Sequence, residues 1–213
     1  MTSAPPSVQR TADRLDWDAI VSLVPDGAKV LDLGCGDGGL LARLAQEKHA
    51  TARGVEINEV NVRACITRGL SVRQGNIEEG LADYPDGAFD VVILSQTLAY
   101  INRGRPVVAE MLRVGKRAIV SFENAGYYRD RLRVLFGGGF GGDLTVEEPR
   151  QRPITLGQFR AFCASLGAEV VDAVFVGRRS AGPGGRRALW PALFAHQAVY
   201  LLGRSDRAPA AAP

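Results

Sequence analysis

The stretch VLDLGCGDG (residues 30–38) decides the fold class of this chain. It is a short apolar run that passes directly into a loop with glycine at every second position, and residues 40–47 then follow a helical pattern. Glycines at such a junction let the backbone approach a ligand closely, and the first turn of the next helix offers free N–H groups. The stretch therefore predicts a strand–loop–helix unit with a ligand site at its loop.

Short apolar runs and helical patterns alternate along the rest of the chain. The expected strands are residues 28–33, 52–57, 70–74, 89–94, 117–122, 169–176 and 197–202. The expected helices are residues 40–47, 59–68, 106–114 and 155–166. This spacing predicts right-handed βαβ units and a mostly parallel sheet, in an α/β fold. The last two strands have no clear long helix between them, which favours an antiparallel pair.

The composition fits one globular domain. The chain has 213 residues, of which 46% are hydrophobic and 23% charged, and this excludes a largely disordered or collagen-like protein. We expect a flexible N-terminus at residues 1–12, a domain at 13–203 and a disordered tail at 204–213. Within the domain, residues 123–152 are expected to form an insertion and 177–195 a second long connection.

Several classes of protein are excluded by what the sequence lacks. No apolar run approaches the roughly 18 residues that a membrane span needs, and the N-terminus MTSAPPSVQR lacks the apolar core of a secretory signal. Cys35, Cys65 and Cys163 lie far apart without a CxxC pair, so neither a disulfide framework nor a metal site is expected. The cytoplasm is the expected compartment.

The acidic residues around the loop indicate the charge of the ligand. Asp32 precedes the loop and Asp37 lies inside it, and two carboxylates disfavour a pyrophosphate and suit a cationic or zwitterionic ligand. The third glycine is also displaced from the GxGxxG dinucleotide pattern. Glu56 ends the second expected strand, where an acid can accept hydrogen bonds from both hydroxyls of a ribose.

The segments LDLGCGDG, GVEI, GNIEEG and FDVVIL together resemble the class I S-adenosylmethionine (SAM)-dependent methyltransferases. The resemblance covers roughly residues 14–203 and implies a Rossmann-like, seven-stranded, mostly parallel sheet with an antiparallel last strand and helices on both faces. It implies that Gly34 and Gly36 approach the amino-acid part of SAM or S-adenosylhomocysteine (SAH), and that Glu56 holds the ribose. Asn76 would lie near the adenine and Ile77 would pack on it. The full set of expected cofactor-binding residues is Asp32, Gly34, Cys35, Gly36, Asp37, Glu56, Ile57, Asn76, Ile77, Ser95 and Gln96.

A narrower resemblance is to the methionine-biosynthesis MetW family. It is carried by residues 31–44, 54–98, 111–122 and 189–202, and the run ILSQTL (93–98) is its most specific part. This resemblance implies a SAM- or SAH-binding protein that acts with, or activates, homoserine O-acyltransferase. The chain departs from the family after Phe122, where ENAG stands in place of the usual Pro-Asn-Phe-Gly.

The sequence leaves the chemistry open. No catalytic residue is identified, because methyl transfer to a good nucleophile needs little beyond proximity and alignment. Gln96 and Tyr100 either contact a methyl acceptor or cap a loop and pack on the cofactor. The chain is thus either a cofactor-sensing partner of homoserine O-acyltransferase or a SAM-dependent small-molecule methyltransferase. The sequence does not decide whether it forms a homo-oligomer.

Charge is divided unevenly between the two halves. Residues 1–100 hold 9 basic and 14 acidic side chains, whereas residues 101–213 hold 17 basic and 9 acidic side chains. The arginines of the basic half could contact nucleic acid, which would favour a nucleic-acid methyltransferase, but no RNA-binding module is present and solvated connections are favoured. A third interpretation is a protein-docking surface, since arginine and aromatic residues are enriched at interfaces. Its aromatic candidates are Tyr127, Tyr128, Phe136, Trp190 and Phe194.

Overall fold

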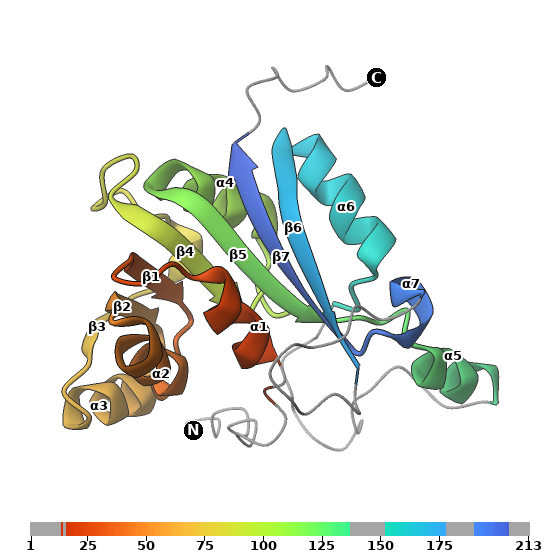
Figure 1. The fold of residues 1–213 in the computed structure, drawn as a ribbon, viewed down its shortest axis with the longest axis horizontal. Helices are drawn as coiled ribbons and strands as arrows, with labels where there is room; N and C mark the ends of the chain where they lie inside the picture. Colours follow the sequence, from red (N-terminus) through yellow and green to blue (C-terminus); the bar gives the residue numbers. More distant parts are fainter. Residues whose placement is uncertain (1–13, 15, 137–151, 178–189, 205–213) are drawn as a thin grey trace.

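The computed structural model describes residues 14, 16–136, 152–177 and 190–204. They form one seven-stranded sheet in the order β3-β2-β1-β4-β5-β7-β6 (Figure 1). The strands are β1 (Lys29–Leu33), β2 (Thr51–Glu56), β3 (Ser71–Gln74), β4 (Phe89–Ser95), β5 (Gly115–Glu123), β6 (Ala168–Val176) and β7 (Gln197–Arg204). The first five strands are parallel, and β7 runs antiparallel to both β5 and β6. The expected fold class, with its antiparallel last strand, is confirmed.

Helices cover both faces of this sheet. They are α1 (Asp16–Leu23), α2 (Gly39–Lys48), α3 (Glu59–Thr67), α4 (Gly104–Val114), α5 (Tyr128–Leu135), α6 (Leu156–Ser165) and α7 (Pro191–Phe194), with a short 3₁₀ helix, η2 (Ile77–Glu79). Helices α1 and α2 share one apolar core with the sheet, and α4 and α6 share another on the opposite face. This layered arrangement leaves the carboxyl ends of the parallel strands as one continuous edge, where ligands bind in open α/β sheets.

The strands at the centre of the sheet are apolar on both faces, as their sequences predict. Val30 of β1 packs in the α1–α2 core with Leu44, whereas its neighbour Leu31 packs in the α4–α6 core with Met111. Successive side chains of a strand point to opposite faces, so a strand between two helical layers has to be apolar throughout.

Side-chain caps fix where two helices begin. Thr155 caps α6 in a capping box with Gln158, at the start of the helix expected over residues 155–166. Asn58 caps α3, since its side-chain oxygen accepts hydrogen bonds from the backbone N–H groups of Val60 and Asn61.

The structure contains helices α1, α5 and α7 that the sequence pattern did not predict. Helix α5 lies inside the expected insertion, and none of its residues is buried. The apolar residues Tyr128, Leu132 and Leu135 follow helical spacing, but a run of eight residues that contains three arginines is too short to stand out as a helical pattern. The expected flexible N-terminus, residues 205–213 of the tail, residues 137–151 of the insertion and residues 178–189 of the second connection lie outside the described residues. None of the helices in the described parts is long and apolar enough to cross a bilayer.

Candidate functional site

A cavity of about 460 Å³ lies over the glycine loop at the carboxyl ends of β1, β2 and β4. We call it the glycine-loop cavity. All eleven residues expected to bind the cofactor line it, so the fold brings them together from four separate stretches of sequence. The lining also contains residues that the sequence analysis did not assign to a cofactor site, namely Arg14, Trp17, Leu40, Val55, Asn61, Gly75, Glu78, Thr97, Tyr100 and Ile101.

The loop itself requires glycine at two of its positions. Gly34 has a φ of +75°, and a Cβ added there would lie 2.9 Å from the side-chain oxygen of Thr97. Gly36 has a φ of +56° with nothing within 4 Å of an added Cβ, because it faces open space at the cavity. Both positions occupy the left-handed region that side chains disfavour. The backbone is therefore both tightly turned and uncovered where a ligand would lie.

Glu56 ties the end of β2 to this loop. Its carboxylate accepts hydrogen bonds from the backbone N–H groups of Gly36, at 2.9 Å, and Asn58, at 2.8 Å. The side chain is buried at the cavity wall, and each oxygen keeps a further lone pair for a ligand hydroxyl. Glu56 can thus shape the loop and accept hydrogen bonds from a ribose at the same time.

The two loop aspartates have different roles in the structure. Asp37 is already satisfied, since its carboxylate accepts from the backbone N–H of Gly39 at 3.1 Å and pairs with Arg68 at 3.0 Å. Asp32 is only 2% exposed, and its Oδ1 has no hydrogen-bond partner among the described residues. Burial raises the pKa of Asp32 from 3.8 to about 7, against the opposing charge of Arg14. Asp32 is therefore the carboxylate that a cationic ligand group would satisfy.

Arg14 is held at the same cavity by a buried polar network. Asp16 is fully buried at the start of α1, and its Oδ2 accepts from the hydroxyls of Ser95, at 2.7 Å, and Ser121, at 2.6 Å. Arg14 donates to the Ser95 hydroxyl at 2.5 Å and lies 3.3 Å from the other oxygen of Asp16. Its guanidinium also stacks over the ring of Trp17, 4.9 Å from the centroid. These contacts fix a cation beside the incompletely compensated Asp32.

Sequence analysis missed Arg14, Asp16 and Ser121 as parts of this site. Asp16 and Ser121 are 105 positions apart, and no local pattern marks such a pair. The sequence holds only a weak signal for this network. Ser95 and Ser121 lie near the carboxyl ends of the parallel strands β4 and β5, and such ends meet at one edge of a sheet.

Part of the cavity lining is apolar. Ile57, Ile77 and Ile101 contribute to its lining, and Ile57 is 63% exposed at the rim. Asn76 uses its side-chain oxygen to accept the backbone N–H of Glu78 at 3.0 Å, which leaves one lone pair for a ligand. A flat ring with an exocyclic amino group is compatible with such a lining.

Gln96 has the strained geometry that is common at functional sites. It follows β4 with a φ of +55°, and its side-chain Nε2 is buried without a hydrogen-bond partner among the described residues. Its backbone is held there because Gln96 N donates to both the carbonyl and the hydroxyl of Ser121. A non-glycine residue in this region costs about 1–3 kcal/mol, so the surroundings must hold it there.

Cys35 lies in the loop but is not a reactive thiol. It is buried, and burial raises the pKa of its thiol far above the ordinary value, with the charge of Asp32 acting in the same direction. A thiol that stays protonated is a poor nucleophile. Cys35 instead packs in a small apolar cluster with Leu41 and Cys65.

Comparison with known proteins gives matches over the whole described fold. A family model described as "Methionine biosynthesis protein MetW" matches residues 14–202. The bifunctional methionine biosynthesis protein MetXA/MetW of Rhodopirellula baltica is 38% identical over 122 residues, which are 53% of this chain and 19% of that protein. A ubiquinone biosynthesis O-methyltransferase of Methylococcus capsulatus is 35% identical over 42% of this chain and 40% of its own length. The chain thus spans less than half of either relative.

Solved structures confirm the fold. A SAM-dependent methyltransferase from Mesorhizobium loti superposes with a TM-score of 0.68 at 16% identity, over 90% of this chain and 99% of that one. A possible histamine N-methyltransferase from Thermotoga maritima gives a TM-score of 0.67 at 16% identity, over 90% of this chain and 88% of that one. At such low identity the likeness concerns the fold alone.

Proposed function

The chain belongs to the MetW family of methionine biosynthesis proteins, and from this premise we propose that it binds SAM or SAH in the glycine-loop cavity. The observation that carries the proposal is the buried Asp32, whose Oδ1 lacks a partner among the described residues, beside the anchored guanidinium of Arg14. An α-amino acid bears an ammonium and a carboxylate, and these two side chains match that pair of charges.

The rest of the ligand fits the remaining lining. Glu56 offers carboxylate acceptors at the place of a ribose, and Ile57 and Ile77 offer apolar contacts at the place of an adenine. Asp32 and Glu56 make the buried wall of the site acidic, which disfavours a pyrophosphate. A zwitterionic nucleoside is therefore favoured over a dinucleotide.

Calorimetry with SAH tests this proposal by comparing two matched glycine variants. Gly36 and Gly87 both have a positive φ and open space around an added Cβ, but only Gly36 lines the cavity. Gly36→Val and Gly87→Val should therefore suffer similar backbone strain. We expect Gly36→Val to weaken SAH binding by more than about tenfold and Gly87→Val to bind like the wild type. Equal affinities in the two variants would place the ligand elsewhere.

Glu56→Ala provides a second, independent test at the ribose end. Loss of the carboxylate removes the acceptor for ribose hydroxyls and releases the backbone N–H of Gly36. We expect markedly weaker SAH binding, whereas Glu59→Ala, on the exposed start of α3, should leave it unchanged. Unchanged affinity in Glu56→Ala would contradict the assignment of this residue.

We further propose that the protein acts with homoserine O-acyltransferase and adjusts its activity to SAM. The relative from Rhodopirellula baltica carries MetXA and MetW in one bifunctional chain, which supports an association of the two parts. SAM is made from methionine, so a SAM site on the partner of an early enzyme would provide feedback. The test is acyltransferase activity measured with and without this protein, at several concentrations of SAM. Identical rates in all mixtures would refute the partnership.

A SAM-dependent small-molecule methyltransferase is the second candidate, and Gln96 is the observation that favours it. Its backbone is strained, its Nε2 has no hydrogen-bond partner in the part of the chain that the structure describes, and both Gln96 and Tyr100 line the cavity. An acceptor held there would lie against the cofactor. Transfer of labelled methyl groups to a defined small acceptor, without any effect on the acyltransferase, would favour this candidate.

A further inference from the structure

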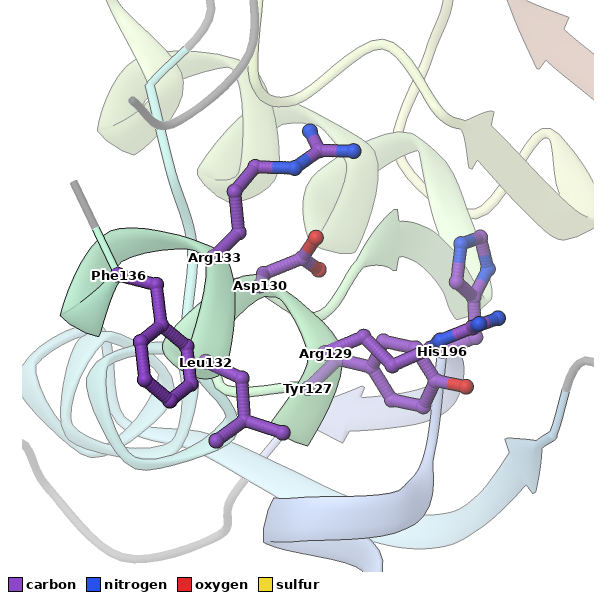
Figure 2. A pocket seen from close by; sticks show the side chains of 7 residues that line it. All are labelled: Tyr127, Arg129, Asp130, Leu132, Arg133, Phe136 and His196. Carbon is purple, nitrogen blue, oxygen red and sulfur yellow. The ribbon is translucent and has the colours of Figure 1, made fainter. Parts of the chain in front are cut away.

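A second cavity lies against α5. It measures about 540 Å³ and is formed by α5 together with Tyr127, Phe136 and His196. In Figure 2, Leu132 and Phe136 project from one side of α5, and Asp130 and Arg133 from another. Figure 1 shows α5 and α7 near the end of β5, and a ring contact between Tyr128 and Phe194, at 5.6 Å, joins the two helices. We call residues 128–136 and 190–194 the α5–α7 surface.

The α5–α7 surface exposes several large apolar side chains. Leu135 is 76% exposed, Phe136 82% and Trp190 75%, and Leu132 and Phe194 are each 45% exposed. Single exposed apolar residues are ordinary, but a contiguous group of them marks an interaction site. An eight-residue helix that buries none of its residues also gains little from its own hydrogen bonds.

Helix α5 of the same surface carries more basic than acidic side chains. Arg129, Arg131 and Arg133 lie on α5 against one acid, Asp130, and the three arginines form no ion pair with any described residue. Some arginines elsewhere in the fold are paired, for example Arg113, which binds Glu110 and Asp86. Among the described residues these guanidinium groups have no carboxylate partner, and carboxylates of another molecule could pair with them.

The base of this surface is anchored before any partner binds. Asn124 is buried, and its side-chain nitrogen donates to the carbonyl of Ala195 at 2.9 Å while its oxygen accepts from the backbone N–H of Gly126. Tyr127 packs edge-on against His196, with ring centroids 5.4 Å apart. These contacts tie the start of α5 to the segment that leaves α7, so little ordering of this base would be required on binding.

A short strip of backbone connects this surface to the glycine-loop cavity. The backbone N–H of Ala125 donates to the carbonyl of Ile154, and the backbone N–H of Arg152 donates to the carbonyl of Ala99. The Arg152 side chain reaches the carbonyl of Asn102, and the intervening Tyr100 and Ile101 line the cofactor cavity. A partner on the α5–α7 surface would thus dock next to the cavity rim.

We propose that the α5–α7 surface is the docking site for a protein partner whose contact face is apolar and ringed by acidic side chains. The identity of that partner as homoserine O-acyltransferase rests on the proposed function. Arginine and aromatic residues dominate binding energy at protein interfaces, and this surface presents both around one cavity. A nucleic acid would match the arginines but would leave Leu132, Leu135 and Phe136 against water or phosphate, so a protein is favoured.

The test uses biolayer interferometry. It measures binding of the purified wild-type protein and its variants to homoserine O-acyltransferase from the same organism. Arg129→Glu/Arg133→Glu reverses the charge, and Leu135→Ser/Phe136→Ser removes the apolar anchors. Matched control changes lie on the exposed face of α3, where Arg63→Glu and Val60→Ser/Ile66→Ser alter the same kinds of side chain. SAH calorimetry on every variant confirms that its cofactor site is intact.

We expect each α5 variant to bind the acyltransferase at least about tenfold more weakly and each α3 variant to bind like the wild type. Wild-type affinity in both α5 variants, or equal losses in the α3 controls, would overturn the proposed surface. A wild-type protein that does not bind the acyltransferase at all would instead refute the partnership, and with it this assignment. Salt-dependent RNA binding that is lost in Arg129→Glu/Arg133→Glu, with unchanged acyltransferase binding, would assign the surface to nucleic acid and overturn the proposal.

Discussion

Replacing Asp32 with asparagine should stabilise the unliganded protein above neutral pH and weaken its cofactor binding. Asp32 is buried without full compensation, and its pKa is raised from 3.8 to about 7. Since one pKa unit corresponds to about 1.36 kcal/mol, ionised Asp32 costs the folded state up to about 4 kcal/mol above pH 7. Asparagine cannot ionise and avoids this cost.

The pH dependence gives the sign of the effect. The folded-state pKa of Asp32 lies above its unfolded value, so the cost is absent below pH 4, grows as the pH rises towards 7 and stays constant beyond that. It amounts to roughly 2 kcal/mol at pH 5 and about 4 kcal/mol at pH 8. The stability of Asp32→Asn relative to wild type should therefore increase by roughly 2–3 kcal/mol between these two pH values.

Urea unfolding of both proteins at pH 5, 6, 7 and 8, without ligand, measures this difference. Asp90→Asn is the control with the opposite sign, because Lys116 and the backbone N–H of Lys29 lower the pKa of Asp90, and its removal should reduce stability at neutral pH. Calorimetry should show SAH affinity rising with pH towards 7 in the wild type and staying low and flat in Asp32→Asn. A stability difference that does not change with pH would refute the argument, since Asp32 would then not titrate in this range.

Three further outcomes are expected from the same structure. Arg14→Gln should weaken binding of SAH more than binding of methylthioadenosine, which lacks the amino-acid part, and equal losses measured by calorimetry would exclude Arg14 from carboxylate recognition. Ser121→Ala removes a buried hydrogen bond to Asp16 and should cost about 1–3 kcal/mol in urea unfolding, so a change near zero would show that the network is dispensable. Burial raises the pKa of the Cys35 and Cys65 thiols, so both should react slowly with a thiol reagent at pH 8 in the native protein and fast in urea, whereas fast native labelling would contradict their burial.

Much of the fold and of the candidate site followed from local sequence. The loop from Gly34 to Gly38 and the acid at Glu56 are recognisable because backbone conformation and strand period are local properties. The expected cofactor residues then gather at one cavity, because parallel strands bring their carboxyl ends to the same edge. Their role in cofactor binding stays a prediction for the calorimetry described above.

Helix α5 shows why other features could not be predicted. Its apolar residues have helical spacing but do not face a core, and only the folded structure shows that Leu135, Phe136 and Trp190 remain exposed. The sequence did mark Phe136 and Trp190 as docking candidates from residue type, but it could not place them on one surface.

The sequence by itself determined that a glycine loop and two neighbouring carboxylates stand at the end of the first strand. Only the tertiary structure decided which of these two carboxylates stays available to a cationic ligand group. Asp37 is neutralised by Arg68, which lies 31 positions away in the sequence. Asp32 is buried, and the charge that acts on it comes from Arg14, which precedes the first strand. Charge compensation and burial depend on contacts between distant residues, so the electrostatics of this site appear only once the chain has folded.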